Sequence, residues 1–221
     1  MRSFLLWAAS ALFSGCVSLP PPDTARTLGA DEVAADFTLV SGAFSEVSLG
    51  GPRDPASQDS TYDPIQLDYV PVLTAGVTRG LGSRTDVGVH ITSTTFVGGH
   101  LKHQFTGTAT SRFAAALRVD AGVNTWLLGI GGGLYGHGSA SAVVSYHPSA
   151  KATLFAAPRY TAVGVTVPGP LGRPDGRWML GSVAYGVAVG ESNRLVFEVT
   201  HARSGSVLPS QATVGYRHRL R

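Results

Sequence analysis

The stretch 112–126, RFAAALRVDAGVNTW, alternates strictly between two kinds of side chain. Every second residue from Phe113 to Val123 is apolar, whereas the intervening residues are charged, polar or small. Such a period of two indicates a β-strand whose faces meet different surroundings. The run exceeds the roughly five or six residues of an ordinary strand. An inward apolar face would give a soluble sandwich or lipocalin-like barrel, and an outward one a membrane barrel.

The same alternation recurs along the chain. It predicts ten strands, at 36–47, 65–79, 85–92, 96–106, 112–126, 139–147, 151–163, 177–189, 194–202 and 210–220. The predicted connections include short turns at 80–84, 107–111, 147–150 and 190–193, longer segments at 48–64, 127–138 and 164–176, and two further short ones at 93–95 and 204–209. Short and long connections that alternate are typical of an outer-membrane barrel with periplasmic turns and surface loops.

Composition favours the membrane alternative. Only 14% of the residues are charged, Lys102 and Lys151 are the only lysines, and soluble sandwiches usually carry more lysine and glutamate outside. Basic residues form no cluster of the kind that binds nucleic acid. The single cysteine, Cys16, excludes an intrachain disulfide and a zinc–thiolate cluster.

Aromatic residues lie near predicted strand ends on the apolar face, with Tyr69 at one rim and Phe105, Phe113 and Tyr146 at the other. This placement resembles interfacial girdles. We therefore predict an all-β fold: an antiparallel up-and-down transmembrane β-barrel of about ten strands over residues 31–221, preceded by a signal peptide and a Pro-rich tether.

The N-terminus carries targeting signals. Residues 1–15 form a signal peptide with a basic start and an apolar region too short for a spanning helix. The segment that ends in Ser14-Gly15-Cys16 resembles a bacterial lipobox, which implies lipidation of Cys16; an ordinary secretory signal is the alternative. Val17 follows instead of Asp, so the resemblance implies an anchor on the periplasmic side of the outer membrane. Residues 16–30, with three consecutive prolines, are predicted to be the lipidated N-terminus and a linker.

Two stretches resemble small outer-membrane barrel proteins and barrel-bearing lipoproteins of Gram-negative bacteria: 73–81 running into 84–89, and 156–160. The resemblance is one of pattern. It implies no cofactor. It also implies partners in outer-membrane lipid and in the machineries for barrel assembly and lipoprotein sorting, but leaves the oligomeric state open.

The polar strand faces supply a candidate network in the lumen: Asp68, Asp86, His90, His100, Lys102, Arg118, Asp120, Arg159, Glu198 and Arg217. A barrel of this size is filled by side chains. Charges in so confined an interior require partners. We expect ion pairs that stabilise the barrel; a narrow conduction path or a bound small ligand is the alternative.

Two further groups of residues could carry chemistry, but the sequence supports them less strongly than it supports the lumen network. His201, Ser204, Ser206 and Glu198 are comparable to the His-x-Ser-Asn motif of outer-membrane lipid A deacylases, but no Asn follows and Glu198 precedes. His90 and His100 could face each other across two strands as a metal pair, although a hydrogen-bonded pair in the lumen fits as well. We therefore predict no catalytic residue and no metal site.

The sequence thus predicts an outer-membrane β-barrel lipoprotein with a structural or accessory role and a side-chain-filled lumen. The first alternative is a lipid-tethered, soluble periplasmic barrel that binds an apolar ligand inside. The second is a lipid-modifying enzyme. The direction of Leu117, Val119 and Val123 distinguishes a lipid-facing barrel from a soluble one.

Overall fold

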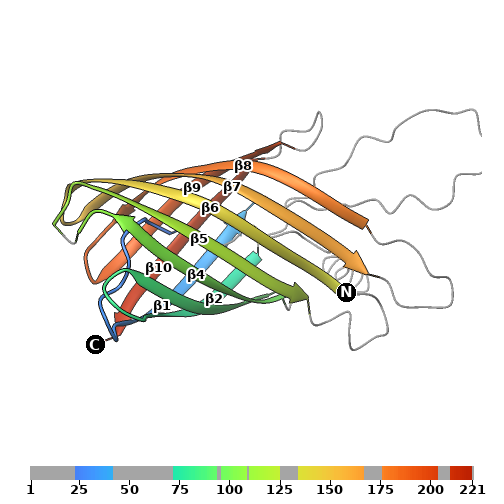
Figure 1. Cartoon of the computed structure of the whole chain (residues 1–221), viewed down its shortest axis with the longest axis horizontal. Helices are drawn as coiled ribbons and strands as arrows, with labels where there is room; N and C mark the ends of the chain where they lie inside the picture. Colours follow the sequence, from blue (N-terminus) through green and yellow to red (C-terminus); the bar gives the residue numbers. More distant parts are fainter. Residues whose placement is uncertain are drawn as a thin grey trace, which may run out of the picture.

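The computed structural model describes residues 23–41, 72–93, 96–108, 110–124, 134–166, 176–203 and 210–220. They form ten strands: β1 (Val33–Ser41), β2 (Val72–Gly80), β3 (Thr85–Thr92), β4 (Phe96–Thr106), β5 (Phe113–Asn124), β6 (Leu134–Ser149), β7 (Ala152–Thr166), β8 (Gly176–Val189), β9 (Asn193–Arg203) and β10 (Ser210–Leu220). Each strand pairs antiparallel with the next in the chain, and β1 pairs with β10, which closes the barrel (Figure 1). The predicted up-and-down barrel of ten strands is confirmed.

Strand bounds follow the alternation closely. β3, β4 and β10 match the predicted ranges to the residue. The predicted loop 127–138 is wrong in its last residues, because β6 begins at Leu134 and its Gly136 and Gly138 pair with Val123 and Ala121. β1 begins three residues before the predicted 36–47, and 42–47 and 65–71 lie outside the described residues.

The apolar face of β5 points outward. Leu117, Val119 and Val123 are 50%, 46% and 38% exposed, whereas Arg118 and Asp120 are each 2% exposed. The other strands repeat this arrangement, with exposed leucine, valine and aromatic side chains outside and mostly polar or small side chains inside. A soluble barrel would carry the reverse pattern, so the alternative with an apolar, ligand-binding interior is wrong for the described strands.

The two ends of the barrel differ. One end, here called the turn end, carries the short connections 81–84, 107–112, 150–151 and 190–192 together with the start of β1 and the finish of β10 (left in Figure 1). The opposite end is here called the loop end. There, strands begin or end next to the segments 42–71, 125–133, 167–175 and 204–209.

Aromatic side chains mark the turn end. Phe105 and Phe113 are exposed there, and the rings of Phe113 and Tyr146 lie 4.8 Å apart across β5 and β6. Tyr69, expected at the other rim, lies outside the described residues. Within the described ranges no helix is long and apolar enough to cross a membrane.

Candidate functional site in the barrel lumen

The structure places most of the candidate network inside the barrel. Asp86, His90, His100, Lys102, Arg118, Asp120, Arg159 and Glu198 are buried, and the Arg217 side chain is 13% exposed. Asp68 lies outside the described residues. Strand alternation explains the placement, since each residue occupies an inward position.

Some of these charges form ion pairs with one another. Lys102 Nζ lies 3.0 Å from Asp86 Oδ2, and Arg118 Nη2 lies 2.7 Å from Asp120 Oδ1. Arg118 Nε also donates to both Asp120 oxygens. Two nitrogens of Arg159 have no protein partner among the described residues. The ion pairs therefore concentrate on one part of the lumen and leave Arg159 outside them.

A segment before β1 fills the turn end of the lumen. In residues 23–30, here called the inner segment, Thr24, Ala25 and Leu28 are at most 3% exposed. Its backbone N–H groups donate to barrel side chains: Ala25 to Ser145 Oγ at 2.8 Å, Thr27 to Gln104 Oε1 at 3.0 Å, and Leu28 to Asp86 Oδ1 at 2.9 Å. The sequence predicted a tether over 16–30. Residues 23–28 of that range instead enter the turn end of the barrel, where barrel side chains satisfy the backbone donors of Ala25, Thr27 and Leu28.

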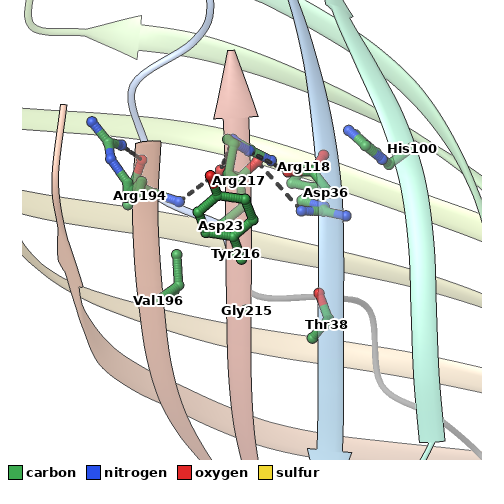
Figure 2. Close-up of a pocket in the computed structure, with 11 residues that line it drawn as sticks. Asp23, Asp36, Thr38, His100, Arg118, Arg194, Val196, Gly215, Tyr216 and Arg217 are labelled. Atoms are coloured by element: carbon green, nitrogen blue, oxygen red, sulfur yellow. Dashed lines mark hydrogen bonds and ion pairs between the residues drawn. The ribbon is translucent and has the colours of Figure 1, made fainter. Parts of the chain in front are cut away.

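Asp23 connects the inner segment to the lumen charges. Its carboxylate lies 2.8 Å from Lys102 Nζ. It also lies 2.9 Å from Arg217 Nη1 and 3.4 Å from Arg118 Nη1 (Figure 2). Burial alone would raise the pKa of Asp23, but the charges of Arg217, Lys102 and Arg118 outweigh it and hold the pKa below its usual range. Asp23 is therefore a carboxylate shared by three cations.

The ammonium group of Lys102 is fully enclosed. It donates to Asp23 Oδ2, to the Thr24 carbonyl at 3.2 Å and to the Arg26 carbonyl at 2.9 Å. Asp86 completes the shell as an ionic contact. A buried ammonium requires this complete set of acceptors, since an unpaired buried charge is costly. The inner segment supplies three of the four.

Sequence reasoning missed several members of this site. Asp23 lies in a proline-rich stretch with no alternation, so no local signal marked it as a lumen residue. Asp36 pairs with Arg217, and Arg194 donates to Thr24 Oγ1 at 3.2 Å. Both occupy inward positions near strand starts, where strand bounds are least certain.

The lumen around Asp23 is nearly filled. A cavity of about 20 Å³ lies beside it, lined among others by Asp36, His100, Arg194 and Arg217 (Figure 2). This volume holds about one water molecule. At this level the barrel offers no room for an organic ligand.

The histidines pack against neighbouring residues. His90 and His100 are buried, and each lies over a glycine of the adjacent strand, Gly98 and Gly88. The ring of Phe96 lies 4.5 Å from that of His137 and 6.3 Å from that of His90. No group of three metal-ligating side chains occurs among the described residues.

His201 and Glu198, which were compared with a deacylase motif from the sequence, do not converge. His201 is exposed on the outer face of β9 and makes a 2.8 Å hydrogen bond with the Tyr185 hydroxyl, whereas Glu198 is 3% exposed on the inner face. Side chains on opposite faces of one strand cannot share a proton relay. Ser204 and Ser206 lie outside the described residues.

No protein-family model and no curated protein matches this chain. Solved structures of low identity are similar. The outer membrane protein Ail of Yersinia pestis in a phospholipid bilayer nanodisc aligns with a TM-score of 0.39 and 10% identity, over 86% of this chain and 99% of that one. The N-terminal β-barrel domain of Pseudomonas aeruginosa OprF aligns with a TM-score of 0.38 and 6% identity, over 87% and 100%. At these TM-scores the barrel assignment rests on this chain's own strand pairing.

Proposed function

We propose that this chain is an outer-membrane β-barrel lipoprotein with a structural or accessory role and a closed lumen. The observation that carries the proposal is the inverted distribution of side chains, with apolar residues outside and ion pairs inside. In water an exterior of this kind would drive aggregation, whereas in lipid it is the surface a spanning barrel requires.

The closed lumen follows from what fills it. Ion pairs join the barrel wall to the inner segment, and the cavity beside Asp23 has room for about one water. We therefore propose that the resting protein does not conduct. The catalytic group considered from the sequence does not assemble, because His201 and Glu198 lie on opposite faces of β9.

The lipid anchor is part of the proposal. Cleavage after residue 15 would leave Cys16 acylated on the periplasmic side, where lipoprotein-sorting and barrel-assembly machineries would act on the chain. Asp23 lies seven positions after Cys16. An extended chain of that length spans at most about 25 Å, enough to reach the leaflet at the turn end.

Fractionation with acyl labelling tests this function. We expect the full-length protein in outer membranes, heat-modifiable on gels, extractable only with detergent and labelled by a radioactive fatty acid. Cys16→Ser should abolish the labelling and leave the barrel heat-modifiable and membrane-bound. Release of the Cys16→Ser protein in soluble form would show that the lipid, and not the barrel, holds the chain to the membrane.

A further inference from the structure

The inner segment closes only part of the barrel. Of the partners of Asp23, Arg217 lies three residues inside the last residue of β10, and Lys102 and Arg118 lie near the middle of β4 and β5. Beyond them, toward the loop end, several buried polar groups of the wall have no hydrogen-bond partner among the described residues, although Thr200 donates to Glu198 Oε1.

These unpaired groups form one continuous patch. They are Arg159 Nε and Nη1, His137 Nε2, Ser139 Oγ, Thr161 Oγ1 and Ser182 Oγ. Ser139 pairs with Thr161 across β6 and β7, and Arg159 pairs with Ser182 across β7 and β8. Buried polar groups nearly always have a partner, so a patch of orphaned ones indicates water in this part of the lumen.

Charge balance shows what the inner segment contributes. Inward strand positions with described side chains carry five cations inside the turn-end mouth: Lys102, Arg118, Arg159, Arg194 and Arg217. They carry four carboxylates: Asp36, Asp86, Asp120 and Glu198. The strands alone leave one positive charge in excess. Asp23 of the inner segment supplies a fifth carboxylate among these cations, whereas the half-buried Arg26 of the same segment donates to the Ser111 carbonyl in the turn 107–112. In a confined, poorly hydrated space such an excess is costly, which favours the bound segment.

We propose that the inner segment is a displaceable plug, and that its withdrawal opens the lumen to small anions. The inference rests on the closed lumen proposed above. Withdrawal of the segment removes Asp23 from Lys102, Arg118 and Arg217, and the exposed cations attract anions. Arg159, with two free N–H groups deeper in the barrel, provides the next anion contact along the path.

The ionic attachment of the inner segment depends on one residue. Asp23 makes every direct ion pair between the inner segment and the described lumen wall. The remaining contacts are hydrogen bonds, such as those of Ala25 and Leu28, and the packing of Ala25 in an apolar cluster with Ala114 and Ala116. Removing one partner of a buried ion-pair cluster is strongly destabilising. Neutralising Asp23 should therefore shift the plug toward the withdrawn state by at least about a hundredfold.

Single-channel recording in planar bilayers tests the proposal on the full-length protein. Wild type should be silent, and Asp23→Asn should raise the fraction of time spent conducting by about a hundredfold or more, with a reversal potential in a KCl gradient that shows anion preference. Asp31→Asn is the matched control, because Asp31 lies on the same approach to β1, pairs with Arg79 outside the lumen and has a φ of 62° that Asn tolerates. It should stay silent.

A crosslink separates plug movement from loss of folding. In a Cys16→Ser background, Ala25→Cys with Ser145→Cys places a thiol on each of two residues that a hydrogen bond from the Ala25 N–H to the Ser145 hydroxyl now joins. Added to Asp23→Asn, the oxidised pair should silence the channel, and reduction should restore conductance. Heat-modifiable migration confirms that each variant is folded.

Three outcomes would overturn the inference: a folded Asp23→Asn barrel as silent as wild type, an oxidised crosslink that conducts as well as the reduced protein, or a cation preference. Continuous conductance by the wild-type protein would instead contradict the closed lumen itself.

Discussion

Lys102 Nζ and Asp23 Oδ2 lie 2.8 Å apart, and the two side chains are 0% and 2% exposed. Seventy-nine positions separate these residues in the chain. The pair joins the centre of β4 to a segment that precedes the barrel. It therefore makes the inner segment part of the folded interior, and several consequences of that relationship are measurable.

Lys102→Met should destabilise the folded barrel by about 3–5 kcal/mol, because it leaves Asp23 and Asp86 buried with fewer cations. Urea unfolding in lipid vesicles measures the change. Arg79→Met is the matched control. Its pair with Asp31 is as short, at 2.7 Å, but exposed, so the cost should stay below about 1 kcal/mol. Equal losses in the two variants would contradict the assignment of Lys102 to a closed interior.

The contribution of Asp23 should be insensitive to pH near neutrality. The lowered pKa of Asp23 means that its stabilisation is complete above the unfolded value of about 4 and is lost only as pH falls below that toward the folded pKa. The difference in unfolding free energy between wild type and Asp23→Asn should therefore be constant from pH 8 to pH 5. A difference that shrinks between pH 7 and pH 5 would show that Asp23 is not held by three cations.

A charge on the outer face should cost most at mid-strand. Val119 lies at the middle of β5 and Phe113 at its turn end, and both are exposed. Val119→Arg should destabilise the barrel in vesicles by about 2–4 kcal/mol, and Phe113→Arg by about 0–1 kcal/mol. If this face were in water, the cost of an arginine would not depend on its depth along the strand. Equal effects of the two substitutions would therefore argue against lipid at this face.

Because His90 lies over Gly98, substitutions at these two positions should have coupled effects on the free energy of unfolding. A Cβ on Gly98 would lie 2.6 Å from His90 Nε2. Gly98→Ala should therefore cost about 1–3 kcal/mol through overpacking. His90→Ala should relieve part of it, so that the double variant loses less than the sum of the single ones. Gly181→Ala, with no atom within 4 Å of the added Cβ, is the control and should cost little.

Strand alternation made most of the barrel predictable. A period of two in 112–126 specifies both the strand and its faces, so the inward positions of Arg118 and Asp120 follow from sequence. The predicted start of β6 was wrong because glycines interrupt its apolar face. Gly136 and Gly138 carry no side chain to signal a face, and only pairing with β5 and β7 shows that β6 includes them.

The inner segment was beyond prediction for a different reason. Its structure comes from long-range contacts, such as Arg217 with Asp23 across 194 positions, and not from a local pattern. Three prolines next to Asp23 indicate an extended chain but not where that chain lies. The sequence therefore supplied the charged lumen residues and missed the carboxylate that three of them share.

The direction of the apolar face is the central claim, and spin-label accessibility at Val119 tests it most directly. In a Cys16→Ser background, a nitroxide on Val119→Cys in reconstituted vesicles should be accessible to oxygen and protected from a water-soluble nickel complex. A nitroxide on Ser83→Cys, in the exposed turn 81–84, should show the reverse. If the Val119 label met the nickel complex as readily as the Ser83 label, the face would be in water and the membrane-barrel account would be wrong.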